Sequence, residues 1–526
     1  LYAGQRTERT WRFAEGALLD ADADAMSLPD SSGRLRGQVR AGGRIEIGGA
    51  LDWETTAFVD NRPPEAFVVV ERGARLQARG ASAELDIDGQ GRVRVDSDGG
   101  QIVLRSANAL YLDGGMDAAA GGAGARGGTL GLAFGGSIHA RGASDEVLRA
   151  RAISLSQHSA PAQPLPATLE YGHAALSVEQ LQAGGFDNLS VFGDIRAVGD
   201  VDLRLAQSLR IHGQGTSSLG MAVDAGLSSG LRLSAPYVRL AQARWRQMPG
   251  ENLQGTAAVA SSGPEDHALA VQAELIDIRD VTWLPGFKHV ALESRSDVRL
   301  TNGIASSGNT SALMTAGSMD VTAARLYPTT GAIGTLVAGA SAQTVQTADY
   351  WTDPDAVLRI HGTGADTKPA PESALGTLRL VAATVQQGGN VQAPMGTLQL
   401  GGLIQNGTVG SRVELLPGSV TSTSGAGLSL PYGGTVDGVD WRVGTRSLGS
   451  LTPAGISSMG VTLKANEIEV APGALLDMSG GGELTGAAFV SGRGGSVDVL
   501  RTALADANPR YGFSASGNPV YAIVPG

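Results

Sequence analysis

The unit Gly376-Thr377-Leu378-Arg379-Leu380 returns as Gly396-Thr397-Leu398-Gln399-Leu400, with the single change of Arg379 to Gln399. Apolar and polar residues alternate in each copy, which predicts a strand with one buried face. An interval of about twenty residues is too long for a hairpin and too short for a strand-helix-strand crossover. It is typical of one coil of a parallel β-solenoid, whose strands stack roughly 4.8 Å apart. We therefore expect Leu378 and Leu398 to be buried, one above the other.

The same strand rhythm recurs along the chain. Apolar-polar-apolar pairs separated by Gly, Asp or Asn run from Ile45/Ile47 to Ile468/Val470, without a helical stripe of useful length. We expect an all-β fold, a parallel β-helix with extra-helical loop excursions and about 20 to 25 residues in each coil. The expected parts are 1–180, with insertions near 53–64 and 160–166; 181–375, with insertions near 242–267 and 302–356; and 376–526, the most regular segment.

Composition limits the classes of function. The 526 residues include 76 Gly and no Cys, only 5% are aromatic, and the net charge is −11. Such a chain has no basic surface for nucleic acid, no thiolate metal site and no disulfide, and it suits export through an oxidising compartment. No apolar run approaches the roughly 18 residues of a membrane helix, so we expect no membrane span. The chain begins with Leu1 and shows no signal peptide, so we expect a mature chain or a piece of a longer one.

A set of short segments carries a family resemblance. They are Val321–Thr330, Val385–Gly396, Pro417–Ser422, Leu430–Gly433 with Asp437, Gly438 and Trp441, Asp477–Leu484, Gly494–Leu500 and Tyr521–Gly526, with a weaker match from Leu181 to Pro236. Together they resemble the filamentous haemagglutinin-like exoproteins of Gram-negative bacteria, the passengers of two-partner secretion. The resemblance covers about residues 180–526. The Asn-Pro-Asn motifs of the family's secretion domain are not seen near the start, which suggests an internal or C-terminal section.

The resemblance has implications for fold, location and partners. It implies a right-handed parallel β-helix that is secreted or displayed on the outer-membrane surface and serves adhesion. The implied partners are glycans or proteins on host or bacterial cells, and an outer-membrane secretion partner during export. No cofactor is implied.

Arg244-Trp245-Arg246 is the best candidate for binding. It lies within the irregular excursion 242–267, and Arg beside Trp offers charge and a stacking face for a sugar or a protein. The alternative is a tryptophan folded onto the coil face with solvated arginines beside it. Trp53, Trp283 and Trp351 lie in similar breaks of the rhythm.

Two acidic or histidine motifs are better explained by structure than by metal binding. Asp86-Ile-Asp88-Gly89-Gln-Gly91 begins like a calcium loop, but the twelfth position is Ser97, so a turn between two strands is the simpler interpretation. His212 and His361 share the context Leu-Arg-Ile-His-Gly, at Leu209–Gly215 and Leu358–Gly364. Zinc needs three or four converging ligands, so we expect each histidine to occupy a solvated corner or cap a turn. No metal site is predicted.

Two further segments match catalytic motifs only in part. Gly226-Leu-Ser-Ser-Gly230 matches Gly-x-Ser-x-Gly, but a nucleophile elbow needs a helix after it, and the sequel Leu231–Pro236 predicts a strand. We expect a β-turn. Glu265-Asp266-His267 follows Gly263-Pro264 and is expected in a solvated loop rather than in an acid-base site.

Three functions therefore stand. The first is a non-enzymatic adhesin, a rigid rod whose excursions bind. The second is a polysaccharide-degrading β-helix enzyme, which needs carboxylates converging on one face, and no such set stands out on adjacent coils. The third is a spacer that carries a distal toxin or tip domain. No catalytic residue is assigned.

Overall fold

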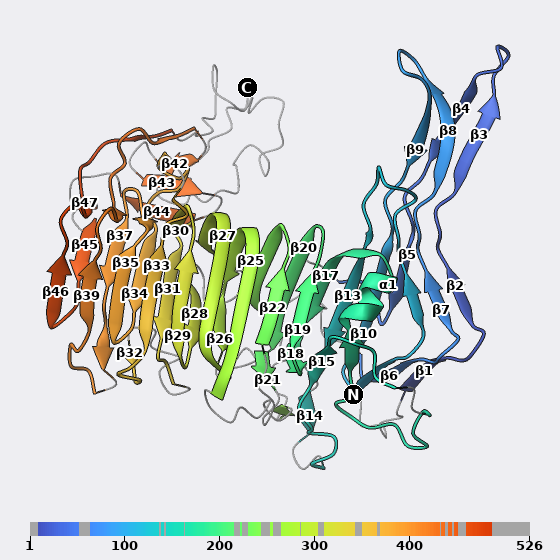
Figure 1. Ribbon diagram of the computed structural model, residues 1–526, viewed down its shortest axis with the longest axis horizontal. Coiled ribbons are helices and arrows are strands. Elements are labelled where there is room, and N and C mark those ends of the chain that lie inside the picture. Colours follow the sequence, from blue (N-terminus) through green and yellow to red (C-terminus); the bar gives the residue numbers. More distant parts are fainter. Residues whose placement is uncertain are drawn as a thin grey trace, which may run out of the picture.

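The computed structural model shows an all-β chain dominated by long parallel sheets, an arrangement compatible with a β-helix (Figure 1). It describes residues 9–51, 64–135, 138–140, 144–161, 164–214, 221–223, 230–243, 253–255, 265–284, 286–302, 310–341, 350–364, 369–404, 406–431, 433–436, 440–443, 446–450 and 459–485.

Three runs of parallel strands, named here ladders A, B and C, form the body of the molecule. Ladder A consists of β19 (Val201–Arg204), β22 (Gly230–Ser234), β25 (Glu265–Arg279), β27 (Phe287–Thr301), β29 (Ser318–Thr322), β33 (Val357–His361), β35 (Thr384–Gly388), β39 (Arg412–Leu415) and β46 (Glu467–Val470). Ladder B consists of β5 (Arg44–Ile47), β10 (Gln101–Ser106), β13 (Gly128–Phe134), β17 (Phe186–Phe192), β20 (Ser208–Gln214), β23 (Tyr237–Ala243), the second halves of β25 and β27, β30 (Arg325–Pro328), β36 (Asn390–Gln392), β40 (Val420–Ser422) and β47 (Leu475–Asp477). Ladder C consists of β26 (Val281–Leu284), β28 (Thr310–Thr315), β31 (Ile333–Ala338), β34 (Thr377–Val381), β37 (Thr397–Leu400) and β45 (Gly460–Leu463).

The chain visits the three ladders in a repeated order. From β25 onward it passes from ladder A to ladder B to ladder C and then returns to ladder A, as in β35, β36 and β37, except that in the described residues no ladder B strand lies between β33 and β34. Strands β25 and β27, of 15 residues each, run through ladders A and B without a break. The register between them shifts at Ala273/Leu275, where one ladder passes into the next.

The two leucines of the repeated five-residue unit are buried and stacked, as the sequence predicts. Leu378 pairs with Leu398 in parallel register between β34 and β37, and both side chains are fully buried. The intervening Arg379 and Gln399 pair on the outward side and are half-buried. Each buried leucine contributes about 2 kcal/mol of transfer free energy, so stacking them stabilises successive strands of the ladder. This prediction is confirmed.

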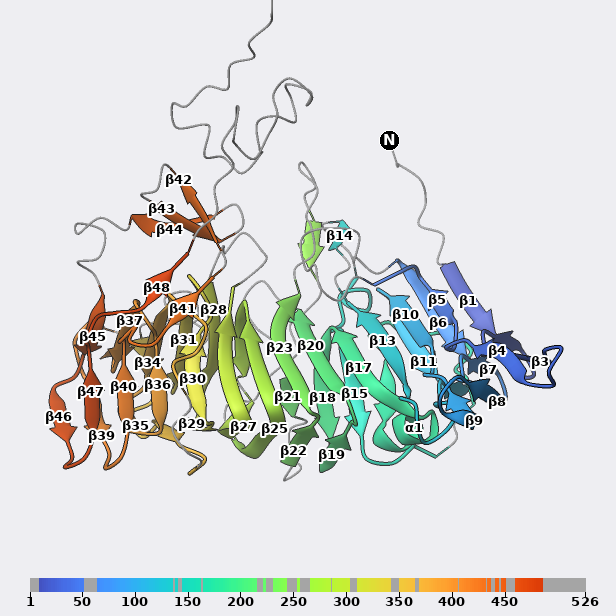
Figure 2. The same ribbon diagram turned by 90° about the horizontal axis from the view of Figure 1, so that it is seen from above.

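The expected uniform coil length is wrong. Leu269 pairs with Val290 after a short return of the expected size, but Met319 pairs with Leu358 after a much longer one. The return from Val413 to its partner Ile468 is longer still. Segments inserted between ladder strands cause the variation. The return that leads to Ile468 contains a small antiparallel sheet, made of β42 (Gly434–Val436), β43 (Asp440–Val443) and β44 (Arg446–Ser450), which stands apart from the body in Figure 2.

The N-terminal part adds short sheets beside ladder B. Two are parallel and three-stranded, with β1 (Arg9–Phe13), β6 (Ala66–Val70) and β11 (Ala109–Leu112) in one, and β2 (Leu18–Asp20), β7 (Arg75–Gln77) and β12 (Gly115–Asp117) in the other. A four-stranded parallel sheet contains β16 (Ala175–Ser177), β15 (Ala152–Ser156), β18 (Asp194–Val198) and β21 (Met221–Val223). Smaller pairs are β14 (Ile138–Ala140) with β24 (Leu253–Gly255), β32 (Tyr350–Trp351) with β38 (Leu403–Ile404), and β41 (Ser429–Leu430) with β48 (Glu483–Leu484).

Two antiparallel hairpins form an arm that projects from the N-terminal end of the body (Figure 1, upper right). One pairs β3 (Ala25–Pro29) with β4 (Leu35–Val39), and the other pairs β8 (Ser82–Ile87) with β9 (Gly91–Asp96). The sequence rhythm of this region predicted coils, but its strands return on themselves because short turns join them. A turn from Asp88 to Gln90 joins β8 to β9.

One short helix, α1 (Val178–Ala183), lies beside β16 and β17 (Figure 1) and was not expected from the sequence. Ser177 caps it, accepting a hydrogen bond from the backbone N–H of Gln180, while the Gln180 side chain bonds back to the Ser177 backbone. This capping box, together with buried Val178 and Leu181, explains a short helical segment in an otherwise β chain.

Candidate functional site

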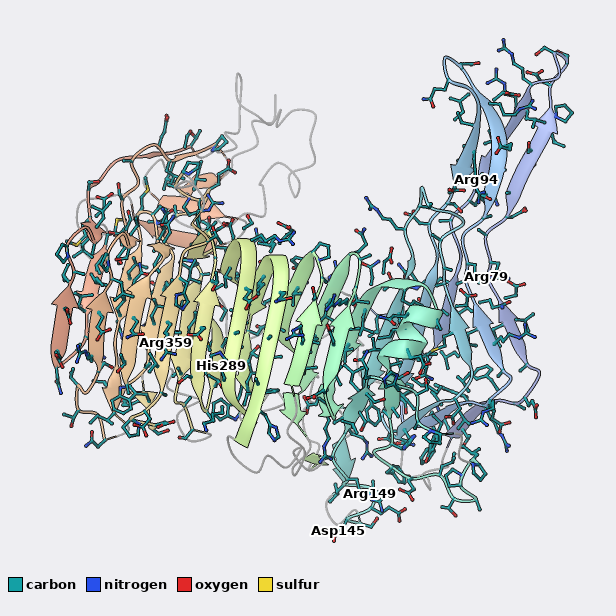
Figure 3. The ribbon with its side chains drawn as sticks, viewed as in Figure 1. Arg79, Arg94, Asp145, Arg149, His289 and Arg359 are labelled. Carbon is teal, nitrogen blue, oxygen red and sulfur yellow. The ribbon has the colours of Figure 1, made fainter. Side chains whose placement is uncertain are left out.

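The outward side of ladder A carries a continuous row of polar side chains. Because inward Met319, Val321, Leu358 and Ile360 are buried, the alternate residues of the same strands face outward. The row, named here the ladder A stripe, consists of His289, Asp320, Arg359, His361, Gln386, Arg412, Glu414, Glu467 and Glu469. Figure 3 labels two of these residues, His289 and Arg359.

At one end of the stripe, two histidines and an arginine surround one carboxylate. Nε2 of His289 lies 3.2 Å from Oδ2 of Asp320, and Nε2 of His361 lies 3.8 Å from Oδ1 of the same residue. The Arg359 guanidinium is 3.5 Å from Oδ1. These four side chains come from β27, β29 and β33, which are neighbouring strands of ladder A.

A chain of polar contacts leads to the other end. Nε of Arg359 donates to Oε1 of Gln386 at 3.1 Å, and Nε2 of Gln386 donates to Oε2 of Glu414 at 2.8 Å. Arg412 then lies among three carboxylates, 2.6 Å from Glu414 and 3.3 Å from both Glu467 and Glu469. The charges of Glu467 and Glu414 raise the pKa of Arg412.

This acidic end corrects one expectation, because carboxylates do converge on adjacent strands. Glu414 and Glu469 are register partners between β39 and β46, although they lie far apart in the sequence. Two short segments of the sequence could have indicated this convergence, Arg412-Val-Glu414 and Glu467-Ile-Glu469, because both alternate charged and apolar residues as a strand does. All three carboxylates share the Arg412 guanidinium as an ion-pair partner, whereas a general acid needs surroundings that favour its neutral form. The acidic end therefore suits hydrogen bonding to hydroxyl groups better than proton donation.

Ladder B presents a second polar cluster, which is more deeply buried. Asp277 accepts two hydrogen bonds from Arg299, at 2.7 and 2.9 Å, and one from the Tyr237 hydroxyl at 2.9 Å. Burial lowers the pKa of Arg299, but the hydrogen bonds and charge of Asp277 outweigh this effect and raise it. Burial, followed by the charge of Asp277, raises the pKa of Tyr237 to about 12.

The next pair along ladder B repeats this arrangement. Arg325 donates to both oxygens of Asp297, at 2.9 and 2.7 Å, and the Tyr327 hydroxyl donates to Oδ2 at 3.3 Å. Another Arg325 nitrogen donates to the Pro369 carbonyl at 2.9 Å. With Asp277 and Asp297 only 5% and 6% exposed, this cluster holds the strands together and leaves little carboxylate surface for a ligand.

The predicted binding triplet, Arg244, Trp245 and Arg246, lies outside the described residues, as does Trp53. Trp283 and Trp351 are buried in an apolar cluster on ladder C, with Met314 and Val381. The indole N–H of Trp351 donates to the Ser411 hydroxyl at 3.1 Å. These two tryptophans thus cover a sheet face, whereas the two interpretations of Trp245 remain predictions.

The two histidines with a shared sequence context occupy different surroundings. His212 follows the core residues of ladder B, is fully buried and stacks on Phe192 with ring centroids 4.4 Å apart. Burial lowers its pKa to about 3, so it is neutral. The solvated corner expected for His212 is therefore wrong. His361 lies on ladder A, and its side chain is 48% exposed, consistent with the expectation.

The remaining motifs are structural or untested. Glu265-Asp266-His267 opens strand β25 and His267 is buried, so the expected solvated loop is wrong. Gly226 to Ser229 lie outside the described residues, but Gly230 begins strand β22, and no helix follows in the described residues up to β23. The elbow geometry is therefore not met.

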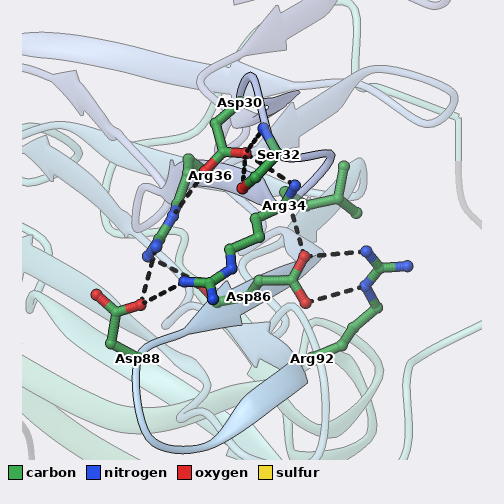
Figure 4. A network of polar contacts seen from close by, with 8 residues as sticks. Asp30, Ser32, Arg34, Arg36, Asp86, Asp88 and Arg92 are labelled. Atoms are coloured by element: carbon green, nitrogen blue, oxygen red, sulfur yellow. Dashed lines mark hydrogen bonds and ion pairs between the residues drawn. The ribbon is translucent and has the colours of Figure 1, made fainter.

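The aspartates that open like a calcium loop are bound by arginines (Figure 4). Asp86 lies near the end of β8 and accepts from Arg92 at 2.9 Å and from the Leu35 N–H at 2.7 Å. Asp88 begins the turn and accepts from Arg36 at 2.8 Å. The turn interpretation is confirmed. Within the described ranges, no group of three His, Cys, Asp or Glu side chains is placed to hold a metal ion.

Comparisons with known proteins identify no relative of this chain. No family model, no curated protein and no solved structure matches the chain. In the part of the chain that the structure describes, no helix is long and apolar enough to cross a membrane.

Proposed function

We propose that the body is a right-handed parallel β-helix that serves as the rigid rod of an adhesin. The parallel pairing of all three ladders, their repeated A-B-C order and one apolar cluster from Ile45 to Leu415 support this fold. A core that continues through every ladder makes each strand depend on its neighbours, which stiffens the whole body.

The observation that carries the adhesive role is the ladder A stripe. Its polar side chains repeat at roughly the strand spacing of 4.8 Å, on a rigid support. A linear polymer laid along the ladder meets donors and acceptors strand after strand, as a glycan requires. The resemblance to filamentous haemagglutinin-like exoproteins adds secretion through an outer-membrane partner and display at the cell surface. We infer that glycans or proteins on host or bacterial cells are its targets.

Attachment to cells and to a glycan array tests this role. The purified chain is compared with a triple variant, Arg244→Ala, Trp245→Ala and Arg246→Ala, and with a stripe variant, Gln386→Ala and Glu414→Ala. We expect the wild type to bind and at least one variant to lose binding at an unchanged circular dichroism spectrum. If the wild type binds neither cells nor glycans, the adhesin proposal fails and the chain is better explained as a spacer.

The second candidate function is polysaccharide cleavage, which the convergence of Glu414, Glu467 and Glu469 favours. Inverting hydrolases use two carboxylates with room for a water between them. Incubation with a polysaccharide panel, followed by assays for reducing and unsaturated ends, separates the candidates. Turnover above a heat-inactivated control that disappears in Glu414→Gln would replace the adhesin proposal by an enzymatic one.

A further inference from the structure

We propose that His289, Arg359 and His361, grouped around Asp320, form a binding site for a carboxylated sugar that binds more tightly at acidic pH. This inference rests on the proposed glycan-binding function and adds to it the ligand class and its regulation. It concerns one end of the ladder A stripe, on strands β27, β29 and β33.

The side chains of this site are accessible and close together. Those of His289, His361 and Arg359 are 42%, 48% and 38% exposed, while that of Asp320 is 26% exposed. All three cationic or titratable groups lie within 3.8 Å of the Asp320 carboxylate. Asp320 therefore holds them on one patch and fixes their orientation before any ligand arrives.

Small residues next to this patch leave room for a ligand. The outward partner of Asp320 on β27 is Ala291, and the partner of Ala291 on β25 is Ala270. On the other side, Gly388 is the partner of His361. The Leu416 side chain lies against the Gly388 position, so the open side of the patch is the one toward Ala291 and Ala270. A sugar ring lying over these alanines can bring its carboxylate to the exposed edges of the imidazoles and the guanidinium that surround Asp320.

The charge of the patch depends on pH. Asp320 and Arg359 form an ion pair of opposite charges. Histidine is the side chain whose charge ordinarily changes between about pH 8 and pH 5, so a patch that contains two histidines gains positive charge on acidification. The other charged or titratable groups on β27 are Lys288, Glu293, Arg295, Asp297 and Arg299, and those on β25 are Glu265, Asp266, His267, Glu274, Asp277 and Arg279. Arg295 pairs with Glu274, whereas Asp277, Asp297 and Arg299 belong to the ladder B cluster. Glu293 accepts a hydrogen bond from Gln272 of β25 at 2.8 Å, and His267, next to the register partner of His289, is buried. Strand β35 presents only Gln386 and Gly388 toward the patch.

The opposite end of the stripe restricts the ligand further. From Asp320 to Glu469 there are four strand intervals, about 19 Å at the usual spacing. Glu414, Glu467 and Glu469 would repel a second anionic group there, but their oxygens accept hydrogen bonds from sugar hydroxyls. The site therefore fits an oligosaccharide with one carboxylate at one end and neutral residues beyond it, rather than a polyanion.

Calorimetric titration of the whole chain tests this site. The probe is a trisaccharide ending in glucuronic acid, with the trisaccharide ending in glucose as the neutral counterpart, each at about pH 5.5 and pH 7.5. We expect the acidic trisaccharide to bind at least about tenfold more tightly at the lower pH, since protonation adds charge-assisted hydrogen bonds. The neutral trisaccharide should show no such change.

Variants show whether the pH dependence of binding comes from this site or from a general effect of acid on the protein. His289→Gln with His361→Gln should abolish the pH dependence, and Arg359→Gln should weaken binding at both values of pH. His158→Gln, a change on a segment after β15, is the matched control and should behave as wild type. Equal affinity at both values of pH, unchanged binding by the double variant, or no binding of the acidic trisaccharide overturns the inference. If cells or other glycans still bind in that case, the adhesin proposal stands; if nothing binds, both fail.

Discussion

In the body, parallel strands place Leu, Val and Ile inward on one ladder after another, and residues such as Leu358, Leu378 and Leu398 are completely buried. In the arm, two antiparallel hairpins leave Met26 50% and Leu28 61% exposed and are joined through the pairs of Arg34 and Arg36 with Asp88. Both regions are β-structure, but apolar burial holds the first and surface charge holds the second. Surface ion pairs contribute little each, so the arm depends on having several of them.

The body and the arm should respond differently to substitution. A layer of the body loses stability when one core position is made polar, because neighbouring strands share that core. The arm has little core to lose, so it should respond to the charge state of a few carboxylates instead. We therefore expect the largest effects of substitution in the core of the body.

Leu398→Asp should be the most damaging change. Leu398 is fully buried, between the register partners Leu378 of β34 and Val461 of β45. An unpaired carboxylate in this position costs several kcal/mol, on the order of 5. Thermal and urea unfolding should show a large loss, and hydrogen exchange should rise over the neighbouring ladder C strands. Arg379→Gln, on the outward side, should be nearly silent. Equal damage by the two substitutions would contradict the assigned inward and outward sides.

Asp277→Ala should destabilise the body by a smaller amount. It removes the acceptor of both Arg299 hydrogen bonds and of the Tyr237 hydroxyl. Breaking a buried pair usually costs about 3–5 kcal/mol, and because Arg299 is 31% exposed we expect about 2–3 kcal/mol. Asp202→Ala, at the exposed pair with Arg204, is the control and should change the urea midpoint much less. If Asp202→Ala lowers the free energy of unfolding as much as Asp277→Ala does, burial does not determine how much these ion pairs contribute to stability.

Acid should loosen the arm before the body. Hydrogen bonds from Ser32 and from the backbone N–H groups of Arg34 and Ser32 lower the pKa of Asp30 to about 2. Arg92 lowers the pKa of Asp86, and Arg36 lowers that of Asp88. Because the folded-state pKa values are lower than the ordinary value of 3.8, these groups stabilise the arm fully above that pH. Their contribution is lost as the pH falls from about 4 toward 2.

Hydrogen exchange across this pH range checks the prediction for the arm. After correction for intrinsic rates, β3, β4, β8 and β9 should lose protection near pH 2.5, while β34 and β37 keep theirs. Asp86→Asn with Asp88→Asn should reproduce part of the loss at pH 5, where wild type is protected. Simultaneous loss in body and arm would show that the two regions are one cooperative unit.

The local alternation of apolar and polar residues was predictable from the sequence, but the pairing of distant strands was not. The inward and outward sides at Leu378 and Leu398 follow from the alternation within each short repeat unit, so they were predictable. The sequences Leu209–Gly215 and Leu358–Gly364 are nearly identical, yet His212 lies on ladder B and His361 on ladder A, and only the neighbouring strands decide that His212 is buried and His361 exposed.

The candidate site depended on the same long-range information. Glu414 and Glu469 meet only because β39 and β46 are neighbouring strands of ladder A, although a long segment separates them in the sequence and no local pattern fixes its length. Gln387 occupies an inward position that alternation predicts to be apolar. It is tolerated because its amide donates to the Gly389 and Val420 carbonyls and accepts from the Gly389 N–H.

The smallest effect distinguishes two glycines with almost the same backbone conformation. Gly89 in the arm turn has φ +82 and Gly401 in the body has φ +86, so alanine strains both by about 1 kcal/mol. A Cβ at Gly89 would meet open space, whereas at Gly401 it would lie 2.3 Å from the Lys464 carbonyl oxygen. Gly401→Ala should therefore cost about 2–3 kcal/mol in urea unfolding, because ladder C must shift. Gly89→Ala should cost about 1 kcal/mol, measured as local opening of β8 and β9 by hydrogen exchange. If the two substitutions lower the free energy of unfolding equally, the backbone of the body relaxes around the added methyl group as easily as the open turn of the arm does. The proposed difference between the tightly packed body and the open arm would then be wrong.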